Sequence, residues 1–476
     1  MAGWTDGFRA LDLVVLVYGV TLVVSQALLL AGSVQLHRWR AAAVAPSVER
    51  TRRGRAPGIA IIVPAHNEEA CIVQSVRSLL SSAYPNLEVI VVNDGSADGT
   101  LAELERAFGL GPPEPPPEST IELRGAIEDV RRSSAHPLVV VTKRPAGSRA
   151  DAVNAGVVVA RLPLLCFVDA DSVIEHHALL HLAEPFVRAP SRTVAVGGSI
   201  RIVNGSDVRN GEVVRARSPR NLLARFQAIE YLRSFLASRA GWSKARGLVI
   251  ISGAFGLYRR DVVLAVGALH AESLGEDMDL TLRVHRFCID DGRPYAIEQA
   301  PEAICWTEGP DRLRGLAVQR RRWAQGAVEV LRDHRNLIER RAGTIGMVAV
   351  PWYVVFELLA PFIEITGIAV VAFGLATGSM QPGRVALISA VALCWAILFS
   401  STALLLERAY QPRYGRRRDV VSLAVAIVLE PILYRPFTLV WRVHGTFRAL
   451  LGTEPTWGSI PRSGLGATSD ALLPVA

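Results

Sequence analysis

The sequence predicts an α/β domain, built around a doubly wound parallel sheet and flanked by transmembrane helices. Two observations support this fold class. Half of the 476 residues are hydrophobic, and the apolar excess lies at the N-terminus and beyond about residue 345. Between these two regions, short β-branched runs alternate with helical stretches, which is typical of α/β folds. A chain of this length has room for more than one domain.

The first apolar segment, Leu13–Leu36, carries no charge and is long enough to cross a bilayer as one helix. Acidic and basic residues precede it and a strongly basic stretch follows it, unlike the order in a cleaved signal peptide. Cytoplasmic flanks collect Arg and Lys, so this arrangement predicts an anchor at residues 1–40 with its N-terminus outside. A basic linker at 41–57 would lead into a cytoplasmic domain at 58–340.

Four apolar runs predict parallel strands that are buried on both faces of a sheet. The runs are too short for helices and too uniformly apolar for half-exposed strands. They are Ile59–Val63, Val89–Val92, Leu138–Val141 and Leu164–Val168. Helical stretches such as Glu69–Ser81 and Ala150–Val159 lie between them. Residues 109–137 contain a proline-rich run, where we expect a surface insertion.

The C-terminal region, residues 341–450, predicts further transmembrane or interfacial helices, followed by a tail at 451–476. Val385–Leu406 has the length and composition of a spanning helix, and Met347–Ala376 is also long enough. The short loop between these two segments contains one arginine, whereas the loop after Leu406 contains five. This asymmetry predicts that the second loop is cytoplasmic.

The segment Val420–Arg442 leaves two alternatives open. It holds Glu430, Pro431, Arg435 and Pro436, so it either spans the membrane or lies re-entrant against the other helices. Ionisable residues in a membrane are costly unless they are paired or face water. They would either line a polar path for an acceptor or form structural pairs, for example Glu430 with Arg435.

The formal charge is +8, and the basic residues cluster beside the apolar segments. Such clusters set topology and attract anionic lipid, so we expect membrane lipid as a partner and no nucleic acid. The five cysteines form no Cys-x-x-Cys pair. They predict small buried side chains in a reducing compartment, and neither a disulfide framework nor a zinc site.

Three acidic motifs lie at the ends of predicted strands or at the start of a helix. They are Asn93-Asp94-Gly95-Ser96, Asp169-Ala170-Asp171 and Gly275-Glu276-Asp277-Met278-Asp279. Each alone fits an ordinary turn or helix start. Together they would lie at the carboxyl edge of one sheet, where α/β folds bind phosphorylated ligands. An Asp-x-Asp pair can hold a hard divalent cation, and a separate Asp can deprotonate an acceptor hydroxyl.

Two further motifs complete a recognisable series: Val63-Pro64-Ala65-His66-Asn67-Glu68 before the acidic set, and Gln319-Arg320-Arg321-Arg322-Trp323 after it. With these five motifs in order, the chain resembles the membrane-embedded family 2 glycosyltransferases. This group contains the cellulose, chitin, hyaluronan and poly-N-acetylglucosamine synthases. The resemblance covers about residues 59–326 and continues more weakly to the C-terminus. It implies a GT-A-type nucleotide-sugar-binding domain that uses Mg²⁺ or Mn²⁺.

The resemblance implies a role for each residue that matches a family motif. Asp277 would be the general base, and Asp171 would be the main protein ligand of the metal. The nucleotide-sugar-binding residues would be Pro64, Ala65, Glu68, Asp94, Arg149, Asp169 and Arg322. The acceptor-binding residues would be Gly253, Ala254, Phe255, Glu276, Gln319 and Trp323.

The chain departs from the family pattern at one position. Where relatives usually carry Gly-Lys before Ala and Asn, this chain has Gly147-Ser148-Arg149-Ala150, followed by Asn154. Arginine keeps the positive charge but is not equivalent to lysine at a tight phosphate site. The sequence therefore leaves the donor sugar open.

The predicted function is inverting transfer from a UDP-sugar to a growing β-linked polysaccharide at the cytoplasmic face of a membrane, with the bacterial cell membrane as its expected location. One alternative is the transfer of a single sugar to a lipid carrier or glycolipid. An alternative of another class is an inactive nucleotide-binding membrane scaffold. A nicotinamide-dependent dehydrogenase is disfavoured, because no Gly-x-Gly-x-x-Gly follows the first strand. The arginine-rich motif could also belong to a basic amphipathic helix on the membrane surface.

Overall fold

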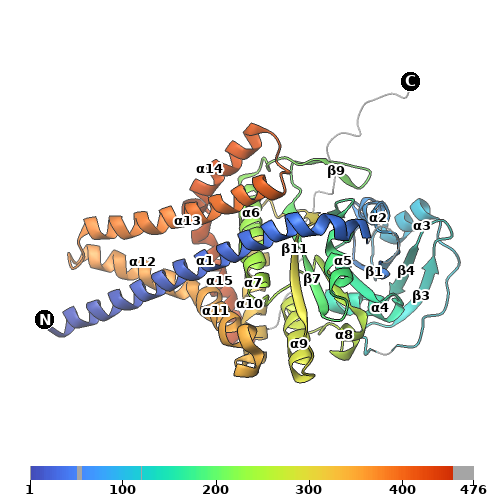
Figure 1. Cartoon of the computed structure of the whole chain (residues 1–476), viewed down its shortest axis with the longest axis horizontal. Coiled ribbons are helices and arrows are strands. Elements are labelled where there is room, and N and C mark those ends of the chain that lie inside the picture. The colour runs from blue at the N-terminus through green and yellow to red at the C-terminus, as the bar shows by residue number, and fades with distance from the viewer. Residues whose placement is uncertain (1, 51–55, 120, 454–476) are drawn as a thin grey trace.

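The computed structural model describes residues 2–50, 56–119 and 121–453, and its central element is a nine-stranded mixed sheet (Figure 1). The strands are β1 (Ile59–Ala65), β2 (Leu87–Asp94), β3 (Ile127–Arg132), β4 (Leu138–Lys143), β5 (Leu164–Val168), β6 (Ser172–Ile174), β7 (Thr193–Ile202), β10 (Phe255–Arg259) and β11 (Ala296–Thr307). Their order across the sheet is β3-β4-β2-β1-β5-β10-β7-β11-β6. A separate hairpin pairs β8 (Asp207–Arg209) with β9 (Glu212–Arg215).

The four predicted strands form the parallel part of this sheet. β1 pairs in parallel with β2 and β5, and β2 pairs in parallel with β4. Successive side chains of a strand point to opposite faces. Accordingly, Ile59 and Ile61 belong to one hydrophobic cluster, whereas Ala60 and Ile62 belong to another. The prediction of strands buried on both faces is confirmed.

Helices cover each face of the sheet. One face is covered by α2 (Ile72–Leu80), α3 (Thr100–Phe108) and α5 (Ala178–Arg188). The other face is covered by α4 (Arg149–Val159), α8 (Arg260–Ala265) and α9 (Glu276–Asp290). The two helices predicted at Glu69–Ser81 and Ala150–Val159 correspond to α2 and α4.

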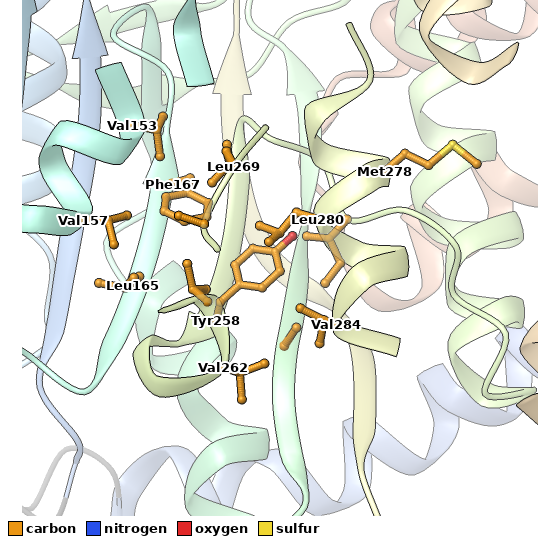
Figure 2. Close-up of a cluster of buried hydrophobic side chains, with 14 of the residues drawn as sticks. Val153, Val157, Leu165, Phe167, Tyr258, Val262, Leu269, Met278, Leu280 and Val284 are labelled. Atoms are coloured by element: carbon orange, nitrogen blue, oxygen red, sulfur yellow. The ribbon is translucent and has the colours of Figure 1, made fainter. Parts of the chain in front are cut away.

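Apolar packing holds α9 in place beside the sheet. Figure 2 shows Leu280 and Val284 of α9 near Tyr258 of β10, with Val262 of α8 close by. These four side chains are almost completely buried. Burying a side chain of this size stabilises the fold by about 1.5–3 kcal/mol. The cluster therefore fixes the first turn of α9, which carries the third acidic motif.

The surface insertion expected at residues 109–137 is only partly correct. Its proline-rich run is exposed, but residues 127–132 return to the sheet as β3, antiparallel to β4. The sequence pattern did not predict this strand, because only Val130 is buried in it and charged residues fill most of its other positions. Charged side chains are typical of an edge strand, where they prevent further pairing.

Two helices are long and apolar enough to cross a membrane within the part of the chain that the structure describes. They are α1 (Ala2–Arg50), whose candidate span is Val14–Ala43, and α13 (Pro382–Tyr410). α1 continues through residue 50, so much of the predicted linker at 41–57 is helical. Residues 51–55 and the tail from 454 onward lie outside the described residues.

Two bent helix pairs raise the number of candidate spans among the described residues to as many as four. Residues 345–358 continue into α12 (Ala360–Ala376) with a bend of 41°. α14 (Arg417–Leu433) and α15 (Arg435–Leu450) meet at a bend of 52°. In Figure 1, α1, α12 and α13 extend from the sheet domain in the same direction. The segment predicted at Val420–Arg442 is thus broken in the middle, and both of its alternatives stay open.

The ionisable residues of these C-terminal helices are paired, although not as expected. Glu430 pairs with Arg233 at 3.3 Å, and Arg435 pairs with Glu364 at 2.5 Å. Glu357 pairs with Arg442 at 3.0 Å. These contacts agree with the alternative of structural pairs, but the example considered for it, Glu430 with Arg435, does not form. Residues five apart point to different faces of a helix, and here the bend between α14 and α15 also separates them.

Four of the five cysteines are buried, as expected, but Cys394 is exposed on α13. It lies on a candidate span, where an exposed side chain faces whatever surrounds the helix. The prediction of a small buried side chain is therefore wrong for Cys394.

A C-terminal helix lies directly against the helix that carries the arginine-rich motif. α15 packs along α10 (Leu313–Asp333). At the contact, a Cβ on Gly445 would lie 2.4 Å from the carbonyl oxygen of Arg321. Only a glycine allows the two helices to approach this closely. The arginine-rich motif is therefore held between the sheet domain and the C-terminal helices.

Candidate active site

One arginine ties together the acidic groups at the carboxyl edge of the sheet. Arg149, the first residue of α4, donates from Nε to Asp169 Oδ1 at 2.8 Å. Its Nη1 donates to Glu276 Oε1 at 2.5 Å, and its Nη2 donates to the carbonyl of Gly253 at 2.8 Å. The planar guanidinium directs these donors at fixed angles, so three segments far apart in sequence are held in one arrangement.

The charges of this cluster are strongly coupled. Burial disfavours the charged form of Arg149, but Asp169 and Glu276 outweigh it and hold the pKa of Arg149 above its ordinary value. Burial raises the pKa of Glu276, and the opposing effect of Arg149 offsets it only in part. Within the described structure, Glu276 Oε2 is buried and accepts no hydrogen bond. A buried acceptor of this kind is a place for a ligand hydroxyl or a water molecule to donate.

Asp277 lies next to this cluster at the start of α9. Its Oδ2 accepts a hydrogen bond from the amide of Gly253 at 3.2 Å, and its Oδ1 accepts one from the amide of Met278 at 2.9 Å. Gly253 therefore contacts both Arg149 and Asp277. The two amides orient the carboxylate and leave it further lone pairs for a substrate.

The Asp-x-Asp turn follows β5 directly. Asp171 is buried, and its Oδ1 accepts long hydrogen bonds from Thr307 at 3.4 Å and Ser172 at 3.5 Å. Among the described residues, no three His, Cys, Asp or Glu side chains are grouped so as to hold a metal ion by themselves. Mg²⁺ is commonly bound by one or two carboxylates together with substrate phosphates. The carboxylates of this turn fit that kind of site and not a cage made entirely of protein ligands.

Asp94 belongs to a second cluster, which the sequence analysis missed. Lys143, at the end of β4, lies 2.5 Å from Asp94 and 2.9 Å from Asp151 of α4. Asp151 also accepts the amides of Arg124 and Gly125. The sequence held a clue, because Lys143 is two residues beyond the predicted strand Leu138–Val141 and so lies at the same edge.

The loop after β1 connects the two clusters. Pro64 and Ala65 end the strand, and the ring of His66 bonds to the carbonyl of Asp94 at 2.7 Å. Cys71 links Glu68 to the Asp-x-Asp turn, since its thiol donates to Glu68 Oε2 at 3.1 Å and lies 3.6 Å from the carbonyl of Ala170. The loop after β1, the Asp94 motif and the Asp-x-Asp turn are thus neighbours at one edge of the sheet, as expected from the ends of β1, β2 and β5.

The arginine-rich motif divides between two surroundings on α10. Arg320 is buried, makes two 2.8 Å bonds to Glu230 and donates to the hydroxyl of Tyr434 at 3.1 Å. Its guanidinium also lies 4.5 Å from the ring centre of Trp323. Arg320 therefore joins α10 to α6 (Leu222–Leu232) and to the junction of α14 and α15. Glu230 and Tyr434 belong to no sequence motif, so the sequence could not predict their contacts with Arg320.

Arg322 of the motif lies near the acidic cluster. Burial lowers the pKa of Arg322, while nearby Glu276, Asp169 and Asp277 act in the opposite direction. Gln319 Oε1 is buried without a hydrogen-bond partner in the described structure, and Trp323 is 42% exposed. With Arg320 enclosed in protein contacts, α10 differs from a basic helix lying freely on a membrane.

One expected acceptor residue is placed differently. Gly253 and Ala254 are half-buried and Gly253 contacts Arg149, but Phe255 is fully buried and belongs to the hydrophobic cluster between the sheet and α2, α3 and α5. Its ring therefore packs the core and does not line an open site. The reason is the alternation of side chains along a strand, because Phe255 begins β10 and points to the face covered by α2, α3 and α5.

This geometry agrees with the comparisons between the chain and known protein families. Residues 164–405 match the family described as "Glycosyl transferase family group 2", and residues 60–114 match "Glycosyl transferase family 2". The first match covers just over half of the chain. The protein therefore belongs to the family 2 group of glycosyl transferases, and the predicted resemblance is confirmed.

Two curated relatives are synthases of one polysaccharide. The chain is 30% identical over 274 residues to a poly-β-1,6-N-acetyl-D-glucosamine synthase of Staphylococcus epidermidis, which covers 58% of this chain and 55% of the relative. It is 28% identical over 274 residues to the synthase of the same name from Staphylococcus aureus, with the same coverage of each chain. The chain thus spans just over half the length of these relatives.

A solved structure supports the fold. A mannosyltransferase from Pyrobaculum calidifontis, determined in complex with GDP-Man and Mn²⁺, superposes with a TM-score of 0.54 at 18% sequence identity. The alignment covers 90% of this chain and 100% of the neighbour. The prediction of a GT-A-type α/β domain flanked by apolar helices is confirmed.

Proposed function

We propose that this protein is an inverting glycosyltransferase that moves a sugar from a UDP-sugar to a growing β-linked polysaccharide. The observation that carries the proposal is that Arg149 bonds to Asp169, Glu276 and Gly253 at once. Asp277 accepts a hydrogen bond from the amide of the same Gly253. This arrangement gathers acid, base and cation groups at the sheet edge where α/β folds bind phosphorylated ligands. The activity named for the staphylococcal relatives supports the same conclusion.

On the donor side, the loop after β1 and the Asp94 cluster would take the nucleoside. Pro64, Ala65 and Glu68 supply the loop, and Lys143 neutralises Asp94. Arg322 would face the diphosphate, because it lies close enough to Asp169 and Glu276 for their charges to act on its pKa, and the diphosphate would bind beside Asp169. A charge-assisted hydrogen bond from arginine stabilises the negative charge that grows on a departing diphosphate.

On the acceptor side, buried groups without partners point to a hydroxylated ligand. Glu276 Oε2 and Gln319 Oε1 each lack a hydrogen bond within the described structure, and the exposed ring of Trp323 offers a surface for a sugar. Asp277 would remove the proton from the acceptor hydroxyl. The hydroxyl oxygen then bonds to the anomeric carbon as the bond to the diphosphate breaks, which inverts the configuration.

Asp171, with Asp169 beside it, would hold Mg²⁺ or Mn²⁺ and so supply Lewis-acid stabilisation to the diphosphate. We expect treatment of the purified protein with EDTA to abolish sugar transfer, and added Mn²⁺ or Mg²⁺ to restore it. UDP release, followed with a coupled assay, measures this. Asp171→Asn should raise the cation concentration that gives half-maximal rate, whereas Asp290→Asn at the far end of α9 should not. Full activity in EDTA would remove the metal from the proposal.

The product distinguishes processive transfer from its alternatives. We expect labelled UDP-sugars, tested as a panel with protein in lipid nanodiscs, to give a ladder of long products with one preferred donor. Mass analysis of the products measures this. A single lipid-extractable product would instead identify transfer to a lipid carrier. A protein that binds nucleotide but releases no UDP with any donor or acceptor would be the inactive scaffold.

We further propose that the domain works at the cytoplasmic face of a bacterial cell membrane. The candidate spans Val14–Ala43 and Pro382–Tyr410 support a membrane location. Arginines follow both spans in the chain, and arginine-rich flanks favour the cytoplasmic side.

A further inference from the structure

A cavity lies away from the candidate active site, where the β8–β9 hairpin meets the loop between α13 and α14. Its volume is about 250 Å³. Figure 1 places β9 near the start of α14, at the junction of the sheet domain and the C-terminal helices. The lining includes Arg215, Arg413, Arg416, Glu175, Trp306 and Val214. Three of these six side chains are arginines, and one is acidic.

The single acidic side chain of the lining is already engaged. Arg413 makes two 2.7 Å bonds to Glu175, one from Nε and one from Nη2. The indole of Trp306 also donates to Glu175 at 3.2 Å. Glu175 therefore balances Arg413, and no other acid lines the cavity beside the remaining two arginines.

Arg215 and Arg416 form no ion pair with any described residue, and both are exposed. Repulsion from nearby Arg215 is the main cause that lowers the pKa of Arg416; Arg418 and Arg217 add to it, and Asp419 opposes them only in part. Arg217 has its own partner, Asp207, at 2.6 Å. Holding like charges together costs free energy unless an anion lies between them.

Another positive charge lies behind the cavity. Arg201 of β7 is 2% exposed, and its Nε and Nη1 lack hydrogen-bond partners in the described structure. It lies within the electrostatic reach of Glu407, Glu175 and Arg413, and its Nη2 donates to Gln411 at 3.1 Å. Because Glu407 is fully buried beside it and offsets its charge, the positive potential of the cavity comes mainly from Arg215 and Arg416.

We propose that this cavity binds the phosphate headgroup of an anionic membrane lipid. Arginine presents paired donors that match phosphate oxygens, and Arg215 and Arg416 both line the cavity without an ion pair to a described residue. The cavity adjoins the loop after α13, a candidate span. Val214, in the lining, is 63% exposed, which gives the glycerol and acyl parts of a lipid an apolar contact that free phosphate would not use.

The test is native mass spectrometry of the full chain in detergent micelles containing phosphatidylglycerol or phosphatidylcholine. We expect one retained phosphatidylglycerol and no retained phosphatidylcholine. The double variant Arg215→Gln/Arg416→Gln should weaken retention by at least about tenfold, because it removes both charge-assisted hydrogen-bond donors to the phosphate. Arg215→Lys/Arg416→Lys keeps the charge and should retain part of the binding.

The matched control is Arg340→Gln/Arg341→Gln. These arginines are also exposed, lack a described ion pair and precede a candidate spanning pair, so the control removes the same charge beside a membrane segment. An equal loss in both double variants would indicate general attraction to an anionic surface and would overturn the proposal. Arginine-dependent binding of inorganic phosphate without lipid binding would overturn it too. Equal thermal unfolding of both double variants shows that a loss of binding does not come from misfolding.

Discussion

Replacing Asp277 by Asn is expected to reduce sugar transfer by about 10²–10⁴-fold, the usual contribution of a general base. The amide cannot take up the proton of the acceptor hydroxyl. It keeps an oxygen that can accept the 3.2 Å hydrogen bond from the Gly253 amide, so the fold around the site should be preserved. The initial rate of UDP release at saturating donor and acceptor measures the effect.

Asp290→Asn provides the control for this variant. Asp290 ends the same helix, is exposed and pairs with Arg286 at 2.9 Å. Its replacement alters the same kind of group on α9 without touching the candidate site, and the rate should stay near that of the wild type. If Asp277→Asn transfers sugar as fast as Asp290→Asn, another group must act as the base.

Replacing Arg149 by Met is expected to lower the free energy of unfolding by about 1–3 kcal/mol, the usual cost of leaving a polar partner unsatisfied, because the Arg149 and Asp169 side chains are 21% and 32% exposed. The change leaves Asp169 and Glu276 facing each other without a cation, and burial already disfavours the charged form of Glu276. Thermal unfolding in detergent measures the loss. Sugar transfer should also fall, since the same guanidinium holds the carbonyl of Gly253.

Arg149→Lys separates charge from geometry. A lysine restores the positive charge, but its single ammonium cannot reproduce three directed contacts at 2.8, 2.5 and 2.8 Å. We therefore expect an unfolding temperature between those of the wild type and Arg149→Met, and a changed preference in the UDP-sugar panel.

Arg144→Met is the matched control for the two Arg149 variants. Its exposed side chain pairs with Glu128, sixteen residues earlier in the chain, and exposed pairs contribute at most about 1 kcal/mol. Equal unfolding temperatures for Arg149→Met and Arg144→Met would show that the Arg149 cluster does not stabilise the protein.

Much of the framework followed from local sequence pattern. The runs Ile59–Val63 and Leu164–Val168 predicted parallel strands correctly, because strands covered on both faces leave no position for a polar side chain. The strand direction then assigned the acidic motifs to one edge of the sheet, because neighbouring parallel strands end on the same side. An uncharged run such as Leu13–Leu36 also needs no tertiary information to be identified as a candidate span.

The electrostatic partners could not be predicted in the same way. Arg149 contacts residues 20, 104 and 127 positions away, and Arg320 contacts Tyr434 at a separation of 114. No spacing rule connects such residues, because their contact depends on how β5, α9, α10 and α15 pack. The same reason explains why the pair of Glu430 with Arg435 does not form.

The sequence by itself determined the α/β class, the strands of the parallel sheet, the candidate spans and the edge at which the acidic motifs meet. These features depend on hydrophobic periodicity and on strand direction, which are local properties of the chain. Only the tertiary structure decided that Arg149 joins the acidic groups, that Lys143 neutralises Asp94, and that Arg215 and Arg416 line one cavity. Charged side chains act over a few ångströms in space, and the packing of distant segments decides which of them meet.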